Sequence, residues 1–74
     1  MHINGNAFIA RQARHNATGR ILTIRHGHNT NTAEDIIWIE VEGQKAKRAT
    51  GKNIAEVYAD IDAAIASGVA TNLL

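Results

Sequence analysis

Histidine is the first residue type in this chain whose spacing could do chemistry, since four of its 74 residues are histidines. His26 and His28 are two positions apart, and residues two apart in a β-strand point to the same side. Two imidazoles on one side could bind a metal ion if Glu34 or Asp35 supplied a third ligand. A lone H-x-H pair beside a polar loop is typical of solvent-exposed histidines, so we predict neither a metal ligand nor a cofactor.

Residues 48–53 lie between a predicted strand and a predicted helix, which is where a phosphate-binding loop would lie. The pattern G-x-x-x-x-G-K-[ST] is broken at Ala46, which replaces the first glycine, and at Asn53, which replaces the hydroxyl residue. What remains is a basic helix N-terminus, whose free backbone N–H groups could bind one phosphate or carboxylate. An ordinary capped helix with surface lysines would have the same sequence.

Nucleophilic catalysis has little support in this chain. It has no cysteine, and its single serine, Ser67, lies at the end of a predicted helix. Asp60 and Asp62 are two positions apart on that helix, so their carboxylates do not face each other. We therefore predict no catalytic residue and expect that the protein is not an enzyme.

The formal net charge of +1 conceals a segregation of charges along the chain. Residues 1–33 contain arginines and no acid, residues 34–42 contain acids and no base, and residues 45–52 are again basic. Such blocks are typical of solvated faces, and they can also attract an acidic partner such as nucleic acid. The second basic block consists of Lys45, Lys47, Arg48 and Lys52.

A chain of 74 residues predicts a single domain, residues 1–74, that buries only about 60% of its unfolded surface. Without cysteine, neither a disulfide nor a thiolate-bound metal can supplement this small core, so we expect a homodimer or a bound partner. No segment approaches the roughly 18 to 20 apolar residues of a membrane span, and residues 1–5 lack a secretion-signal pattern. We expect a soluble, cytoplasmic protein with no membrane partner.

Residues 54–67 have the periodicity of an amphipathic helix. The apolar stripe recurs at spacings of three and four and consists of Ile54, Val57, Tyr58, Ile61, Ala64 and Ile65. Asn53 and Glu56 fit a capping box, which places Glu56 in the first turn. Gly68 can take the left-handed conformation that ends a helix.

The remaining segments are predicted to form a sheet. Two of them are rich in β-branched residues. The alanine and arginine of residues 7–15 favour a helix, whereas the turn-like segment that follows favours a hairpin, and of these two alternatives we choose the strand. Strands are predicted at 7–15, 20–26, 35–42 and 45–49, with a polar loop at 27–32. Residues 69–74 are apolar enough to dock, at a place the sequence does not define. The predicted fold is α+β, with a three- to four-stranded antiparallel sheet packed by one C-terminal helix.

Alternation divides the predicted strands into two faces. The face under the helix would contain Leu22, Ile24, Ile37, Ile39 and Val41. The opposite face would contain Ile21, Thr23, Arg25, Ile36, Trp38 and Glu40. This second face is too apolar to be simply solvated, so either a second copy of the chain or the N-terminal segment with Phe8 covers it, or Trp38 and Arg25 contact a partner. The predicted interface residues are Ile21, Ile36 and Trp38.

Residues 20–68 combine a three-stranded sheet, a basic turn at residues 48–52 (RATGK) and a helix that begins with residues 53–59 (NIAEVYA). This order resembles the amino-terminal arm-type DNA-binding domain of phage lambda-like tyrosine recombinases. The resemblance implies a sheet that enters the major groove, with predicted nucleic-acid or acidic-partner contacts from Arg20, Arg25, Lys45, Lys47, Arg48 and Lys52. Glu40 and Glu42 depart from the family pattern, since they would repel phosphate. The chain is also similar in size and in its lack of catalytic motifs to small phage anti-defence proteins, such as anti-CRISPR proteins.

Two functions follow from these features. The first is a small non-enzymatic binding module of a phage or mobile element, which binds nucleic acid through a basic sheet and turn surface. The alternative is a phage-encoded, protein-binding inhibitor of a host defence system, which acts as a dimer or in a heteromeric complex.

Overall fold

Five strands and one helix make up the computed structural model, which describes residues 7–74. The elements are β1 (Phe8–His15), β2 (Ile21–Asn29), β3 (Glu34–Val41), β4 (Lys47–Thr50), α1 (Lys52–Ala66) and β5 (Ala70–Asn72). This is the predicted α+β class, and β1 confirms the strand predicted within residues 7–15. The predictions made for His2 and for residues 1–5 lie outside the described residues. Within 7–74, no helix is both long and apolar enough to cross a membrane.

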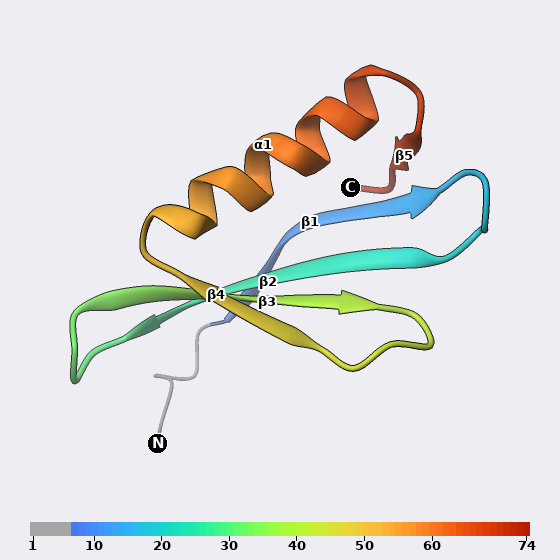
Figure 1. The fold of residues 1–74 in the computed structure, drawn as a ribbon. Helices are drawn as coiled ribbons and strands as arrows, with labels where there is room; N and C mark the ends of the chain where they lie inside the picture. The colour runs from blue at the N-terminus through green and yellow to red at the C-terminus, as the bar shows by residue number, and fades with distance from the viewer. Residues whose placement is uncertain (1–6) are drawn as a thin grey trace.

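The strands form one antiparallel sheet in the order β4-β3-β2-β1-β5 (Figure 1). Strands β1 to β4 follow one another as hairpins, and α1 then returns the chain toward the opposite edge. There the C-terminal segment adds β5 to β1, with Ala13 opposite Asn72 and His15 opposite Ala70. The predicted sheet of three to four strands therefore gains a fifth strand from the segment that the sequence left unplaced.

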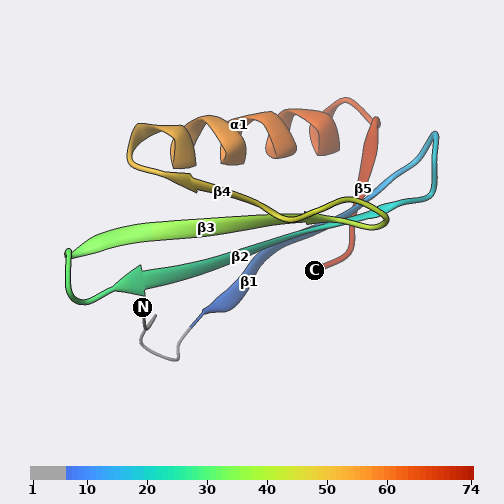
Figure 2. The ribbon, with the colours of Figure 1, turned by 60° about the horizontal axis from the view of Figure 1, so that its bottom comes forward.

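The helix lies across one face of the sheet, so the molecule has two layers (Figure 2). Ala13, Ile24, Ile37 and Ile61 form the buried cluster between these layers, and Ile24 and Ile37 are fully buried. Of the predicted helix stripe, Ile61 belongs to this cluster, and Ile54, Val57, Tyr58 and Ile65 pack against it. Burial of apolar area of this kind is the main favourable contribution to folding.

Helix α1 begins two residues earlier than predicted, and its cap differs. Gly51 is the N-cap, with φ of 60° and no side-chain hydrogen bond, so the predicted capping box of Asn53 and Glu56 is wrong. The positive φ, which glycine tolerates, lets the chain turn directly from β4 into the helix. Glu56 therefore lies beyond the first turn, which contains no acid. The predicted helix end is confirmed, because Gly68 has a φ of +83°.

Strand β2 continues through Asn29, so the prediction of a loop at 27–32 is wrong for its first three residues. Pairing with β3 explains the extension, since Gly27 lies opposite Ile36 and Asn29 opposite Glu34. The Asn29 side chain then accepts a hydrogen bond from the Asn31 backbone N–H at 2.9 Å, which starts the turn. Cross-strand pairing has overridden the local preference of these polar residues for a loop.

Candidate functional site

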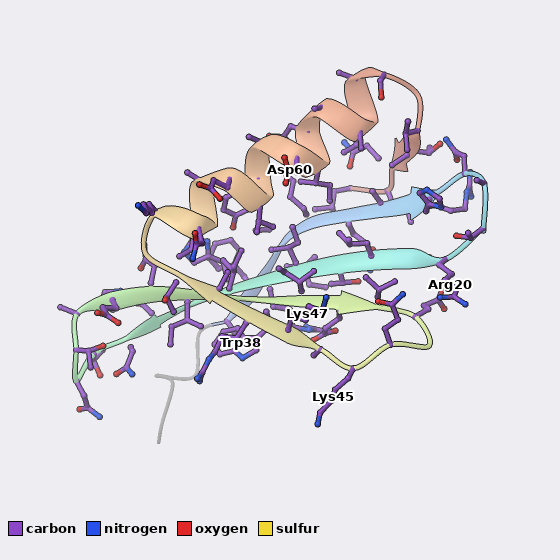
Figure 3. All side chains as sticks on the ribbon, in the orientation of Figure 1. Arg20, Trp38, Lys45, Lys47 and Asp60 are labelled. Atoms are coloured by element: carbon purple, nitrogen blue, oxygen red, sulfur yellow. The ribbon has the colours of Figure 1, made fainter. Side chains whose placement is uncertain are left out.

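The face of the sheet that α1 leaves uncovered follows the predicted division of residues. Leu22 lies opposite Val41 on the helix side, whereas Thr23 lies opposite Glu40 on the other side. We call this uncovered side the open face. Its residues are Ile9, Gln12, Arg14, Ile21, Thr23, Arg25, Glu34, Ile36, Trp38, Glu40, Arg48 and Thr50. Figure 3 shows Trp38 on the side of the sheet away from α1.

One row across the open face combines an aromatic ring with two guanidinium groups. Ile9 lies opposite Arg25, Arg25 opposite Trp38, and Trp38 opposite Arg48, so the row crosses β1 to β4. Both arginines are exposed, and Trp38 is partly exposed. Side chains directly opposite each other on one face lie about 5 Å apart at Cβ, so Trp38 has a cation on either side.

The charges of the open face are only partly paired with one another. Arg25 Nε donates to Glu40 Oε2 at 3.0 Å, and both side chains are exposed. Arg14 and Arg48 form no ion pair with any residue in the described part of the chain. Arg48 is therefore the cation beside Trp38 that is available to an acidic partner.

Two further predicted cations lie at one end of the sheet. The β1–β2 turn with Arg20 and the β3–β4 turn with Lys45 lie at this end, and both side chains are exposed (Figure 3). Lys47 lies opposite Ile39 and so belongs to the helix side, and Lys52 is the first residue of α1. The six predicted basic residues thus separate into the open face, the turns, the helix side of β4 and the helix start.

The predicted interface residues Ile21, Ile36 and Trp38 share the open face, but they differ in exposure. Ile36 is only 5% exposed and offers little surface to a partner, whereas Ile9, which the sequence did not single out, is 39% exposed. Phe8 lies opposite His26 on the helix side and stacks on its ring, with 5.6 Å between centroids. The interpretation that Phe8 covers the open face is therefore wrong, because a β-bulge between Ile9 and Arg11 keeps Phe8 on the helix side.

A polar and aromatic cluster lies at the junction of α1 and the sheet, and the sequence did not predict it. Arg11 Nε donates to Asp62 Oδ1 at 2.9 Å, and the guanidinium lies 4.8 Å from the centroid of the Tyr58 ring. The Tyr58 hydroxyl in turn lies 2.6 Å from His26 Nδ1. The hydrogen bond from Arg11 lowers the pKa of Asp62, and burial raises the pKa of Tyr58. Arg11 and Asp62 are 51 positions apart, so no local spacing could have revealed the contact.

The two histidines of the H-x-H pair lie on one side of β2, as predicted, and both face Asp35. His28 Nδ1 lies 2.8 Å from Asp35 Oδ1, and His26 Nε2 lies 3.6 Å from Asp35 Oδ2. The hydrogen bond from His28, with a smaller contribution from the charge of His26, lowers the pKa of the Asp35 carboxyl. In the part of the chain that the structure describes, no group of three such side chains is arranged to hold a metal ion.

The sequence suggests an anion site at the start of α1, beside Lys47, Arg48 and Lys52. The structure does not place all three of these cations on one side of the chain. Lys47 and Arg48 are neighbours on a pleated strand and so point to opposite faces of β4. The Gly51 carbonyl accepts the Ile54 N–H at 3.2 Å. Ser67, the single serine, donates to the carbonyl oxygen of Ala64 at 3.2 Å.

A cavity of about 260 Å³ lies between the C-terminal half of α1 and strands β1 and β2. Its walls are mainly apolar residues of α1, such as Val57 and Ala64, and of the helix side of the sheet, such as Leu22; its polar members are His15 and Asp60. It contains none of the predicted basic or interface residues. The cavity belongs to the packing between the two layers.

Comparisons with known proteins leave the function to be inferred from this geometry. No protein-family model matches the chain, and neither a curated protein nor a solved structure matches it. The chain is an α+β module with a partly charged, partly apolar open face, and the row around Trp38 is its most distinctive surface.

Proposed function

We propose that this protein binds nucleic acid through the open face of its sheet and the basic turns at one end of that face. The observation that carries the proposal is the row in which Arg25 and Arg48 lie on either side of Trp38. Guanidinium groups bind phosphate oxygens in a planar, two-pronged geometry, and an indole ring can stack on a base. The row therefore offers both kinds of contact that a nucleotide requires.

The exposed cations near this row support the same proposal. Arg14 lies opposite Ile21 on the open face, close to the turn that carries Arg20, and Lys45 extends from the neighbouring turn. Cations gathered at one end raise the local concentration of a polyanion and steer its approach. Because the Arg25 guanidinium is already hydrogen-bonded to Glu40, we expect the strongest phosphate contact of the row from Arg48.

The test is a titration of fluorescein-labelled oligonucleotides, monitored by anisotropy at about 50 mM and 200 mM NaCl. Affinity should fall at the higher salt concentration, because each phosphate contact releases bound counterions. Arg48→Gln should weaken binding and reduce the salt slope by about one. Lys52→Gln removes the same charge at the helix start, away from the open face, and should have the smaller effect of the two. Absence of salt-dependent binding to any oligonucleotide at 50 mM NaCl would overturn the proposal.

A second candidate function is binding of a protein, including a second copy of the chain, on the same face. The exposed fraction of Ile9, 39%, favours it, as does the outer edge of β4, which pairs with no other strand among residues 7–74 and could accept another strand. Light scattering at several protein concentrations distinguishes this candidate. A monomer at every concentration that also binds an oligonucleotide would favour the first function.

A further inference from the structure

We infer that the ligand of the open face is single-stranded nucleic acid, with one base stacked on the Trp38 ring and the backbone held by Arg48. This inference rests on the proposed function and narrows it to one class of nucleic acid. It comes from the width of the sheet, the access to Trp38 and the position of the two arginines.

The sheet is too wide to lie flat in the major groove of duplex DNA. At the level of Trp38, the register aligns four strands, from Ile9 on β1 to Arg48 on β4. Four strands at about 4.8 Å each make a face about 19 Å wide. The major groove is about 12 Å wide and admits a two-stranded ribbon, so this face cannot enter it flat.

Part of the Trp38 side chain is accessible to a ligand on the open face. Trp38 is partly exposed on the open face, and among residues 7–74 no arginine lies over its ring, in contrast to Arg11 over Tyr58. The bases of a duplex are already stacked on one another, whereas an unpaired base can leave its neighbours and stack on an aromatic side chain. The ring therefore favours a strand whose bases are not paired.

The arginines suit the backbone of the same strand. Arg25 and Arg48 begin about one inter-strand spacing on either side of Trp38, so a nucleotide on the ring places its phosphates within reach of a guanidinium. The Arg25 guanidinium forms an ion pair with Glu40, whereas Arg48 has no acidic partner in the described residues. A strand running across the sheet would thus meet a base platform beside an uncompensated cation.

The experiment uses the full chain and four labelled probes: a 12-nucleotide oligothymidine, a 12-nucleotide oligouridine, and a 12-base-pair duplex of DNA and one of RNA. Trp38 is the single tryptophan, so its fluorescence reports on this site alone. We expect at least one single strand to bind about tenfold more tightly than either duplex and to quench the tryptophan fluorescence. The two single-stranded probes distinguish DNA from RNA as the preferred ligand.

Three variants complete the test. Trp38→Leu should weaken single-strand binding about tenfold, and Trp38→Phe should retain most of it, because the smaller ring still stacks. Phe8→Leu is the matched control, since Phe8 is an exposed aromatic residue on the helix side, and it should leave the affinity unchanged. Far-UV circular dichroism and urea unfolding confirm that each variant is folded.

Two results would overturn the inference, and they differ in what they say of the proposed function. Duplex binding as tight as single-strand binding, with no loss in folded Trp38→Leu, would reject stacking on Trp38 but leave nucleic-acid binding in place. No binding to any probe at 50 mM NaCl would reject both.

Discussion

Replacement of Ile37 by valine tests the packing on which the division of the two faces rests. Ile37 is fully buried between β3 and α1, and valine keeps its β-branched shape while removing one methylene. Loss of one buried methylene, together with a small void, should lower the free energy of unfolding by about 1 kcal/mol. In a domain of this size, that corresponds to a fall of about 4–8 °C in the thermal midpoint.

The matched control is Ile9→Val, which removes the same methylene from a side chain that is 39% exposed on the open face. Its cost should stay within about 0.5 kcal/mol. Urea unfolding, monitored by far-UV circular dichroism, compares the two variants, and a slope of about 1 kcal/mol/M converts the difference into a midpoint shift of up to about 1 M. Equal shifts for the two variants would show that α1 does not cover the face that contains Ile37.

Three further predictions concern contacts between distant parts of the chain. Tyr58→Phe removes the hydroxyl that lies 2.6 Å from His26 Nδ1, and it should lower the free energy of unfolding by about 1 kcal/mol in urea titrations. The lowered pKa of Asp35 means that its charged form stabilises the fold fully above its ordinary value of 3.8, and that this contribution is lost as the pH falls through the lower folded value. The urea midpoint of Asp35→Asn should therefore lie below that of the unmodified protein at pH 6, and the two should converge near pH 2; a constant difference would contradict this account. Gly68→Ala places a side chain at a φ of +83° and should lower the thermal midpoint, at a cost of about 1–2 kcal/mol, whereas an unchanged midpoint would show that this turn can relax.

Part of the candidate site was predictable because it depends on local periodicity. Alternation along β2 groups Arg25 with Ile21, and alternation along β3 groups Trp38 with Ile36. The two groups share a face because Arg25 lies opposite Trp38 in the register of the hairpin. The opposite faces of Lys47 and Arg48 also follow from the pleat, once β4 is known to be a strand. Whether Lys47 or Arg48 points toward α1 depends on the register between β4 and β3. Only the structure shows that Arg48 lies beside Trp38.

The amino-acid sequence by itself determined the class of fold, the helix stripe and the two faces of the central strands, since these follow from periods of 3.6 and 2 residues. Only the tertiary structure decided that residues 70–72 join the sheet as β5, that Gly51 is the N-cap of α1, and that Arg11 contacts Asp62. Strand pairing and contacts between distant residues depend on how all the elements of the chain pack together. A short segment of sequence therefore cannot predict them.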